Sequence, residues 1–197
     1  MTCFASMSAF AGSPGFASEQ FAALAQPENM VPVEYQGEIW LVSPQYVGPA
    51  GIGEGFALAQ SLGLSLPSPG LVDAIWRAAD LRITPPIRAS DGTPRTMSTQ
   101  AVFDDQKARI DALIDGRPFS LLAGTHKDIV MGDNQSGPGL KPGKVGIYGW
   151  HTDNPVPGVA LHTPVTPGPG KVIQQPFGGH GLDWKDYSQG LRLVRRA

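Results

Sequence analysis

The sequence predicts an α+β protein, with helices in the first half and a mixed or antiparallel sheet of short strands in the second half. Segments with a helical spacing of apolar residues end at residue 114, and short apolar runs begin at Phe119. Strands and helices do not alternate along the chain, so repeated β-α-β units are disfavoured. A length of 197 residues fits one domain, 1–197, in which residues 1–15 form an N-terminal arm.

The first half is expected to hold an arm, a hairpin and the first helices. Small residues fill the arm, and a short helix is expected at residues 17–26, ended by Pro27. Alternating apolar residues at 31–47 surround a turn at Gln36-Gly37, which predicts a hairpin or two short strands. The glycine-rich segment 48–55 lacks the register of a phosphate-binding motif, so we expect a loop there.

Three helices are expected between this loop and residue 114. The first, within 56–69, is interrupted by Gly63. The second begins at Ser68-Pro69, because a serine cap followed by proline suits the first turn, and it places Trp76 in the core. The third covers 98–114 and has an apolar face formed by Phe103, Ile110, Leu113 and Ile114.

The last part of the chain is expected to supply the sheet. Four short apolar runs, 119–131, 144–150, 171–176 and 191–196, are separated by loops rich in Gly, Pro and Asn. The chain contains 25 glycines and 19 prolines, yet its apolar fraction of 41% is enough for a core.

Charge and cysteine content exclude several classes of protein. The net charge is −2, which does not suggest binding to nucleic acid or to a membrane surface. Cys3 is the single cysteine, so an intramolecular disulfide framework and a Cys-rich zinc site are excluded. The opening residues lack the basic start of a secretory signal, and we expect a soluble protein of the cytoplasm or of a virion.

The candidate site residues gather in the strand-rich part. His126, His151 and His180 each lie in a loop or at a strand end, where functional groups are often placed. The segment FGGHGLDWKDYSQGLRLV, from Phe177 to Val194, combines a histidine, two aspartates, aromatic residues, a serine and an arginine. It is therefore the strongest candidate for a site.

Several segments together resemble a family of largely uncharacterised bacterial and phage-borne proteins. The chain carries PSPGLVDAIWRAADLRITPP, LLAGTHKDIV, VGIYGWH and GH…DYSQGLRLV. The last three are in the order of the family's AG-H-K-D, YGWH and DYS-[HQ]-G-x-R-L-V segments. The match covers about residues 65–195. It brings forward seven candidate residues: His126, Asp128, His151, His180, Asp186, Ser188 and Arg192.

A second resemblance is weaker. SQGLRL, from Ser188 to Leu193, is similar to the S-H-G-C-[IV]-R signature of L,D-transpeptidases. Their nucleophile is a cysteine, and Leu191 stands at that place in this chain. Thioester chemistry is therefore excluded at that position.

Two catalytic arrangements follow from these residue types. In the first, Ser188 is a nucleophile, activated by His180 or His151 and oriented by Asp186 or another aspartate. In the second, His126, His151 and His180 bind a metal, with zinc as the candidate. The leading hypothesis is a small hydrolase of amide or ester bonds in cell-wall or peptide material, whose catalytic residues are His151, His180, Asp186 and Ser188.

The aromatic residues leave other interpretations open. Substrate contacts are expected from Tyr148, Trp150, Trp184, Tyr187 and Arg192. Two alternatives remain for these aromatic side chains. They pack together as a small core with an Asp186–Arg192 pair at its rim, or they stack on a sugar or peptide in a binding groove. The alternative to an enzyme is a structural or assembly protein, such as a phage virion or tail component, whose partners are its own copies or other assembly proteins.

Overall fold

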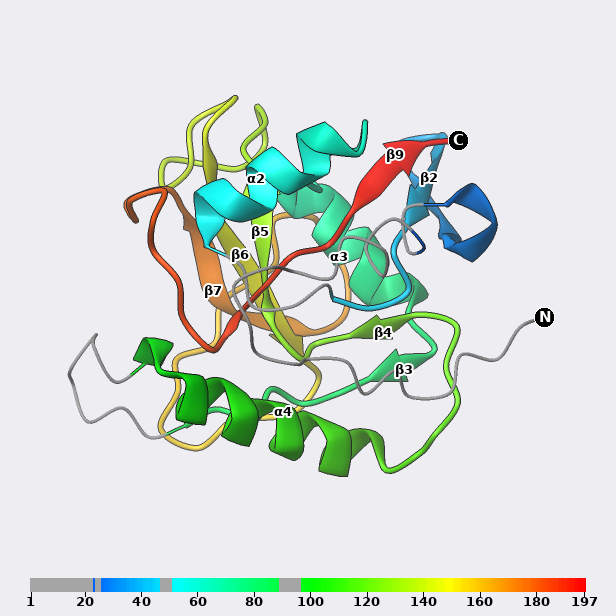
Figure 1. The fold of residues 1–197 in the computed structure, drawn as a ribbon. Coiled ribbons are helices and arrows are strands. Elements are labelled where there is room, and N and C mark those ends of the chain that lie inside the picture. The colour runs from blue at the N-terminus through cyan, green and yellow to red at the C-terminus, as the bar shows by residue number, and fades with distance from the viewer. Residues whose placement is uncertain (1–22, 24–25, 47–50, 89–96) are drawn as a thin grey trace.

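The computed structural model describes residue 23 and residues 26–46, 51–88 and 97–197 (Figure 1). These residues form three α-helices and three small sheets, so the predicted α+β class is confirmed. The predicted order is wrong, because the helices lie mostly in the middle of the chain and strands occur throughout it. The arm 1–15 and nearly all of the helix expected at 17–26 lie outside the described residues.

Each sheet joins distant parts of the chain. In the first, the hairpin of β1 (Val31–Tyr35) and β2 (Glu38–Val42) pairs with the last strand, β9 (Val194–Arg196), in antiparallel orientation. In the second, β3 (Leu81–Arg82) pairs in parallel with β4 (Leu122–Ala123). The third has the order β7 (Lys171–Phe177), β6 (Val145–Thr152), β5 (Lys127–Met131), β8 (Gln189–Gly190). Only its β5–β8 pair is parallel, since β5–β6 and β6–β7 are antiparallel.

The helix that was predicted to begin at Ser68-Pro69 is present, and a short 3-10 turn occurs earlier in the chain. A short 3-10 turn, Pro27–Asn29, precedes β1. The helix α3 (Pro69–Ala78) begins after Ser68, whose side chain accepts a hydrogen bond from the Leu71 amide at 3.3 Å. Trp76 in this helix is 2% exposed and belongs to the core, as predicted.

The helix α4 (Gln100–Ile114) confirms the predicted third helix, with one change in its buried face. Ile110 and Ile114 pack against Leu81 and Leu122 of the parallel pair of strands. Leu113 is exposed, and the buried residue one turn before Ile110 is Gln106.

The glycine-rich segment 48–55 is not wholly a loop. The helix α2 (Ile52–Ser61) begins inside it, because its first free amides find acceptors in a distant loop. The Ile52 amide donates to Trp184 O at 3.2 Å, and the Gly53 amide donates to Leu182 O at 2.7 Å. This helix start therefore depends on a tertiary contact.

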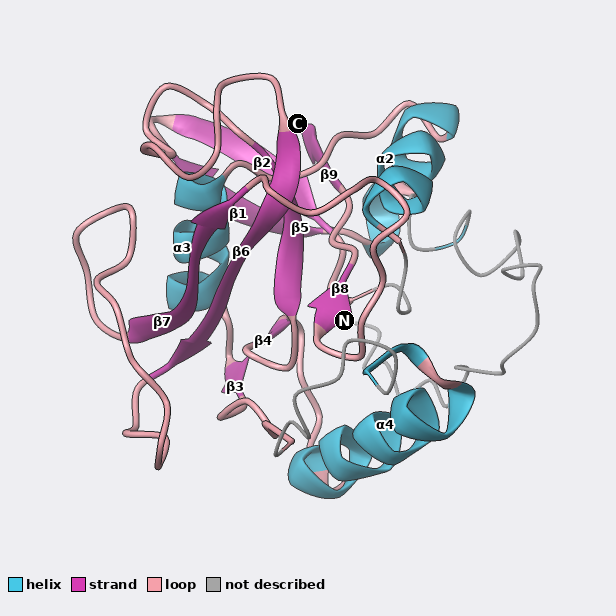
Figure 2. Cartoon of the chain, turned by 90° about the vertical axis from the view of Figure 1, so that its left-hand side faces the viewer, coloured by secondary structure: helices cyan, strands magenta, loops and turns pink. Residues whose placement is uncertain are grey.

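The four-stranded sheet lies between two helices (Figure 2). On one face, Ile52 of α2 joins Ile129 and Ile147 in a buried cluster. On the other face, Val72 of α3 packs with Val130. Neighbouring residues of β5 and β6 thus point towards different helices, as strand geometry requires.

Among the described residues, no helix has the length and apolar character needed to cross a membrane.

Candidate functional site

The residues singled out in the sequence fall into two groups. A buried group on the α3 side of the sheet contains His126, Asp128, Tyr148, His151 and Arg192. A second group, called the loop group below, contains Trp150 of β6 and five residues of the segment before β8: His180, Trp184, Asp186, Tyr187 and Ser188.

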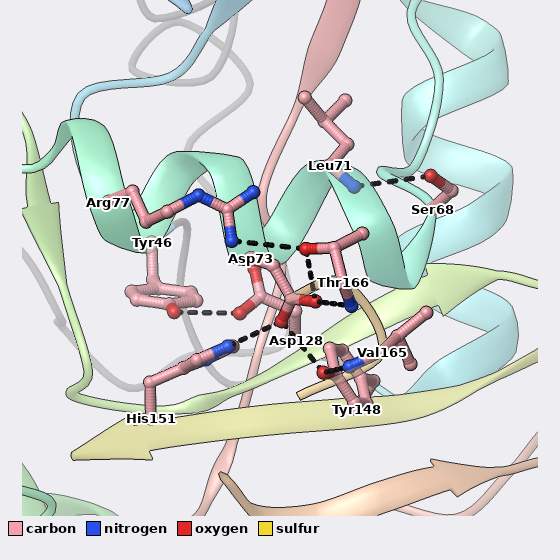
Figure 3. A network of polar contacts seen from close by, with 10 residues as sticks. All are labelled: Tyr46, Ser68, Leu71, Asp73, Arg77, Asp128, Tyr148, His151, Val165 and Thr166. Carbon is pink, nitrogen blue, oxygen red and sulfur yellow. Dashed lines mark hydrogen bonds and ion pairs between the residues drawn. The ribbon is translucent and has the colours of Figure 1, made fainter. Parts of the chain in front are cut away.

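The buried group is organised partly by Asp73 of α3 (Figure 3). One oxygen of its carboxylate, Oδ1, accepts hydrogen bonds from Tyr148 Oη and pairs with His151 Nε2, both at 2.7 Å. The other, Oδ2, accepts from the Thr166 amide at 2.7 Å and from Thr166 Oγ1 at 2.9 Å. Asp73 and His151 are 1% and 3% exposed, so this network joins α3 to β6 and to the loop at residue 166 inside the protein.

The environment of this network favours a neutral tyrosine and a fixed imidazole. Burial, together with the neighbouring Asp73 carboxylate, raises the pKa of Tyr148 well above its usual value. The His151 ring stacks on Trp76 with a centroid distance of 5.4 Å. Sequence reasoning did not single out Asp73, because it lies on a helix 75 residues before Tyr148 and no local motif links them.

A second buried cluster surrounds Asp128. Tyr46 Oη donates to Asp128 Oδ2 at 2.8 Å, and Arg192 Nε lies 3.6 Å from Asp128 Oδ1. Arg192 also donates to the backbone carbonyls of Ser43 at 2.8 Å and Leu122 at 2.7 Å. Arg192 is 0% exposed and pairs with Asp128, so the expected Asp186–Arg192 pair at a rim is not formed.

Burial shifts two titrating groups of this cluster in opposite directions. It raises the pKa of Asp128 to about 6, although the Arg192 charge opposes the shift. It lowers the pKa of His126 to about 4, and here the Arg192 charge adds to the effect. Both side chains are therefore favoured in their neutral forms relative to the unfolded chain.

The loop group centres on Asp186. Its Oδ1 accepts hydrogen bonds from the Ser188 amide at 2.7 Å and from the Ser188 hydroxyl. Its Oδ2 accepts from Trp184 Nε1 at 3.3 Å, and the His180 ring stacks on Trp184 with a centroid distance of 4.5 Å. Ser188 is 0% exposed, and no hydrogen bond between described residues joins it to an imidazole.

The remaining aromatic residues of the loop group lie beside Lys127. The Trp150 ring is in edge contact with Tyr187 at a centroid distance of 6.2 Å. Lys127 Nζ lies 5.2 Å from the centre of the Trp150 ring. Tyr148 instead packs on the α3 face of the sheet, with Val72 and Val130. The four aromatic residues expected to contact a substrate therefore do not form one surface.

The three candidate metal ligands have different neighbours. His126 faces Tyr46, His151 is bound to Asp73, and His180 stacks on Trp184. Within the part of the chain that the structure describes, no group of three His, Cys, Asp or Glu side chains is arranged to hold a metal ion.

A cleft that the sequence did not reveal lies between the β1–β2 hairpin, α2 and the end of β5. Its volume is about 570 Å³. Aromatic side chains come from Tyr35, Trp40 and Phe56. The polar and charged side chains of the lining are Gln36, Glu38, Gln60, Ser65, Ser68, Asp133 and Arg196.

The hairpin register explains how two of these aromatic residues reach the cleft. Val33 pairs with Trp40 and Tyr35 pairs with Glu38, so all four side chains lie on one face of the hairpin. Val33 is buried against α3, whereas Tyr35 and Trp40 are only partly buried and line the cleft. An aromatic residue on each side of a tight turn is the sequence signal for this surface.

The charges of the cleft are nearly balanced. Arg196 Nη1 pairs with Glu38 Oε1 at 3.1 Å, and the Arg196 guanidinium lies 5.4 Å from the Trp40 ring centre. Asp133 Oδ1 accepts hydrogen bonds from the Gln135 amide and from Ser136 Oγ, at 3.0 and 2.8 Å. Arg196, the one basic side chain among the described residues of the lining, is thus already paired with a carboxylate.

Comparison with protein-family models, with curated proteins and with solved structures finds no match for this chain.

Proposed function

We propose that the protein binds a carbohydrate chain in the cleft between the β1–β2 hairpin and α2. The observation that carries the proposal is the combination of three aromatic side chains with amide and carboxylate groups around one cavity of about 570 Å³. A volume of this size lies in the range of small-molecule sites.

Aromatic rings and polar planar groups suit the two kinds of surface that a sugar presents. Trp40, Tyr35 and Phe56 line the cleft with aromatic rings, which suit the C–H faces of sugar rings. Gln36 and Gln60 carry amides that both donate and accept hydrogen bonds, and the carboxylate of Asp133 accepts them from hydroxyl groups.

Other ligand classes fit this cleft less well. A phosphate would need a free cationic group, and Arg196 is paired with Glu38. A peptide would have to extend the sheet along an edge strand, β1 or β9. Pro32 in β1 removes one backbone donor, and Val194 in β9 already forms a bridge with Ser65. A wholly apolar ligand would cover the Gln36 and Gln60 amides without replacing their hydrogen bonds to water, which is costly.

The test is a titration of the full chain with chitotetraose, cellotetraose and a soluble muropeptide, followed by calorimetry and tryptophan fluorescence. We expect at least one of them to bind, and Trp40→Ala to weaken that binding by about tenfold or more. Ile39→Ala is the matched control, because Ile39 is adjacent in β2 but lies on the opposite face of the hairpin.

Two results would overturn the carbohydrate proposal. One is the absence of binding to all three probes at millimolar concentration. The other is equal binding by the Trp40→Ala and Ile39→Ala proteins, with both shown by circular dichroism to be folded.

A hydrolase is the second candidate function, and one observation favours it. The Ser188 hydroxyl donates a hydrogen bond to the Asp186 carboxylate, and His180 stacks on the indole that donates to the same carboxylate. Ser188 would then be the nucleophile that attacks an ester or amide bond of cell-wall or peptide material. The Asp186 carboxylate would accept the proton of the Ser188 hydroxyl.

The hydrolase candidate predicts a loss of activity in Ser188→Ala. If the wild-type chain hydrolyses a p-nitrophenyl ester, the variant should lose about hundredfold or more of its kcat/KM, whereas Ser61→Ala, which removes an exposed hydroxyl, should not. Fluorophosphonate labelling of the wild-type protein, mapped by mass spectrometry, gives a readout that does not depend on a buried substitution. An unlabelled Ser188 together with unchanged turnover in the variant would exclude this function.

A further inference from the structure

Lys127 is a lysine in an unusual position. It is the first residue of β5, it is partly buried, and its neighbour in the parallel strand β8 is Gln189. Among the described residues, its Nζ has no hydrogen bond or ion pair, and it lies over the Trp150 ring, 5.2 Å from the ring centre. Lysines usually extend their ammonium group into water, so a partly buried lysine whose Nζ lies over an indole ring is unusual.

The backbone of β6 beside Lys127, at Gly149 and Trp150, has a strained conformation. Trp150 has φ = 57°, in the left-handed region that a residue with a large side chain rarely adopts, and Gly149 before it has φ = 97°. The pairing of β6 with β7 shifts register between Ile147 and Gly149. Strain of this kind is concentrated at functional sites, where the surrounding fold maintains it.

The contacts of Trp150 show what the strain achieves. Its Nε1 donates to the Thr125 carbonyl at 3.2 Å, which fixes the indole, and its ring meets Tyr187. The indole face is thereby turned towards the Lys127 amine.

Gln189 supplies a second, independent observation. It is 0% exposed, and neither its amide nitrogen nor its amide oxygen has a hydrogen-bond partner among the described residues. Leaving a buried polar group unpaired costs about 1–3 kcal/mol. Because paired residues of neighbouring strands point to the same face of a sheet, this unpartnered amide lies on the face that carries the Lys127 side chain.

Burial of Lys127 favours the free amine. Burial lowers the pKa of Lys127, and the negative charge of Asp186 only partly opposes this. A larger share of the side chain is therefore unprotonated, and able to act as a nucleophile, than in an ordinary exposed lysine.

We propose that Lys127 is a nucleophilic amine that condenses with the carbonyl group of a small aldehyde or ketone. The Nζ lone pair forms a bond to the carbonyl carbon while the C=O π electrons move to oxygen. After the transfer of a proton from nitrogen to oxygen, the carbinolamine loses water and leaves an imine. The aromatic faces of Trp150 and Tyr187 fit a planar carbonyl compound, and the Gln189 amide provides a donor and an acceptor on the neighbouring strand.

The test uses the full-length wild-type chain, so it does not depend on the folding of a variant. The protein is incubated with 4-hydroxybenzaldehyde or with glyoxylate in the presence of sodium cyanoborohydride, which reduces an imine to a stable amine. Peptide mass spectrometry then gives the modification rate of each lysine between pH 5 and 10. The exposed Lys141, Lys144 and Lys171 are the internal standards.

We expect Lys127 to be modified at least about threefold faster than each standard at pH 7, and its rate to reach a plateau at a lower pH than theirs. The Lys127→Met protein should lack this product and keep those of the three standards. A lysine that only packs against Trp150 would be shielded and would react more slowly than the exposed ones. Modification of Lys127 at or below the rate of the standards at pH 7 therefore overturns the proposal.

Lys127 does not line the carbohydrate cleft, which meets β5 at its other end, at Met131. Failure of either proposal leaves the other unaffected.

Discussion

At the scale of single residues, Gly190 shows that the serine-glutamine-glycine segment is shaped by packing. A Cβ atom at this position would lie 2.6 Å from Tyr46 Cδ1 and 2.8 Å from His126 Cβ, both in buried side chains. Neither atom is the end of a flexible chain, so an added methyl group would force the structure apart. Gly190→Ala is expected to reduce the free energy of unfolding by about 1–3 kcal/mol.

Gly181→Ala is the matched control for this prediction. An added Cβ there would meet only the side chain of the exposed residue Asp183, which is free to move away, so we expect a change within about 0.5 kcal/mol. Urea denaturation of the two variants and the wild-type protein gives the comparison. Equal stability of the two variants would show that Gly190 is not required by its neighbours.

Single residues also mark how far the sequence could predict the structure. The Ser68 cap and the core position of Trp76 follow from local spacing, and both are confirmed. Asp73 could not be identified in the same way, because its partners Tyr148, His151 and Thr166 come from much later in the chain. A polar residue on a helix has no local signature of being buried, since burial depends on acceptors and donors brought by the fold.

At the scale of elements, the start of α2 was mispredicted for the same reason, since it depends on a contact with a distant part of the chain. The glycine-rich segment before Phe56 carries no strong helix signal, yet α2 begins at Ile52 because the loop at 182–184 accepts its first amide hydrogens. A Cβ at Gly53 would approach Leu182 to 3.1 Å, so the glycine that weakens the helix signal also permits this close contact. Propensity and tertiary contact oppose each other here, and the contact prevails.

The hairpin was predicted from the sequence, but its part in the cleft was not. Alternation predicted β1 and β2 and the turn at Gln36-Gly37, and the structure contains all three. Which face of the hairpin would be covered was not predictable, because the helix that packs against it, α3, follows later in the sequence. Tyr35 and Trp40 pack against the edge of the core beside α3 and are only partly buried, and this placement makes them candidates for binding.

At the scale of the whole molecule, two buried groups two residues apart influence stability in opposite directions as pH changes. Asp128 has a pKa raised to about 6 from 3.8, so between these values the folded state holds a proton that the unfolded state has lost. Its contribution to stability therefore falls as pH rises from about 4 to about 6. His126 has a pKa lowered to about 4 from 6.5, so there the unfolded state holds the extra proton, and its contribution rises with pH over nearly the same range.

Since each group changes the proton count by about one, each slope approaches roughly 1 kcal/mol per pH unit, and in the wild-type protein the two largely cancel. Asp128→Asn removes the falling contribution, so its free energy of unfolding should rise with pH more steeply than that of the wild type between pH 4.5 and 6. His126→Gln removes the rising contribution and should change the slope in the opposite sense. Urea denaturation at several pH values measures these slopes even where a substitution lowers stability overall, because the slope reports bound protons rather than lost contacts. Slopes that shift in the same direction in both variants would mean that these two groups are not the pair that sets the pH response of the folded chain.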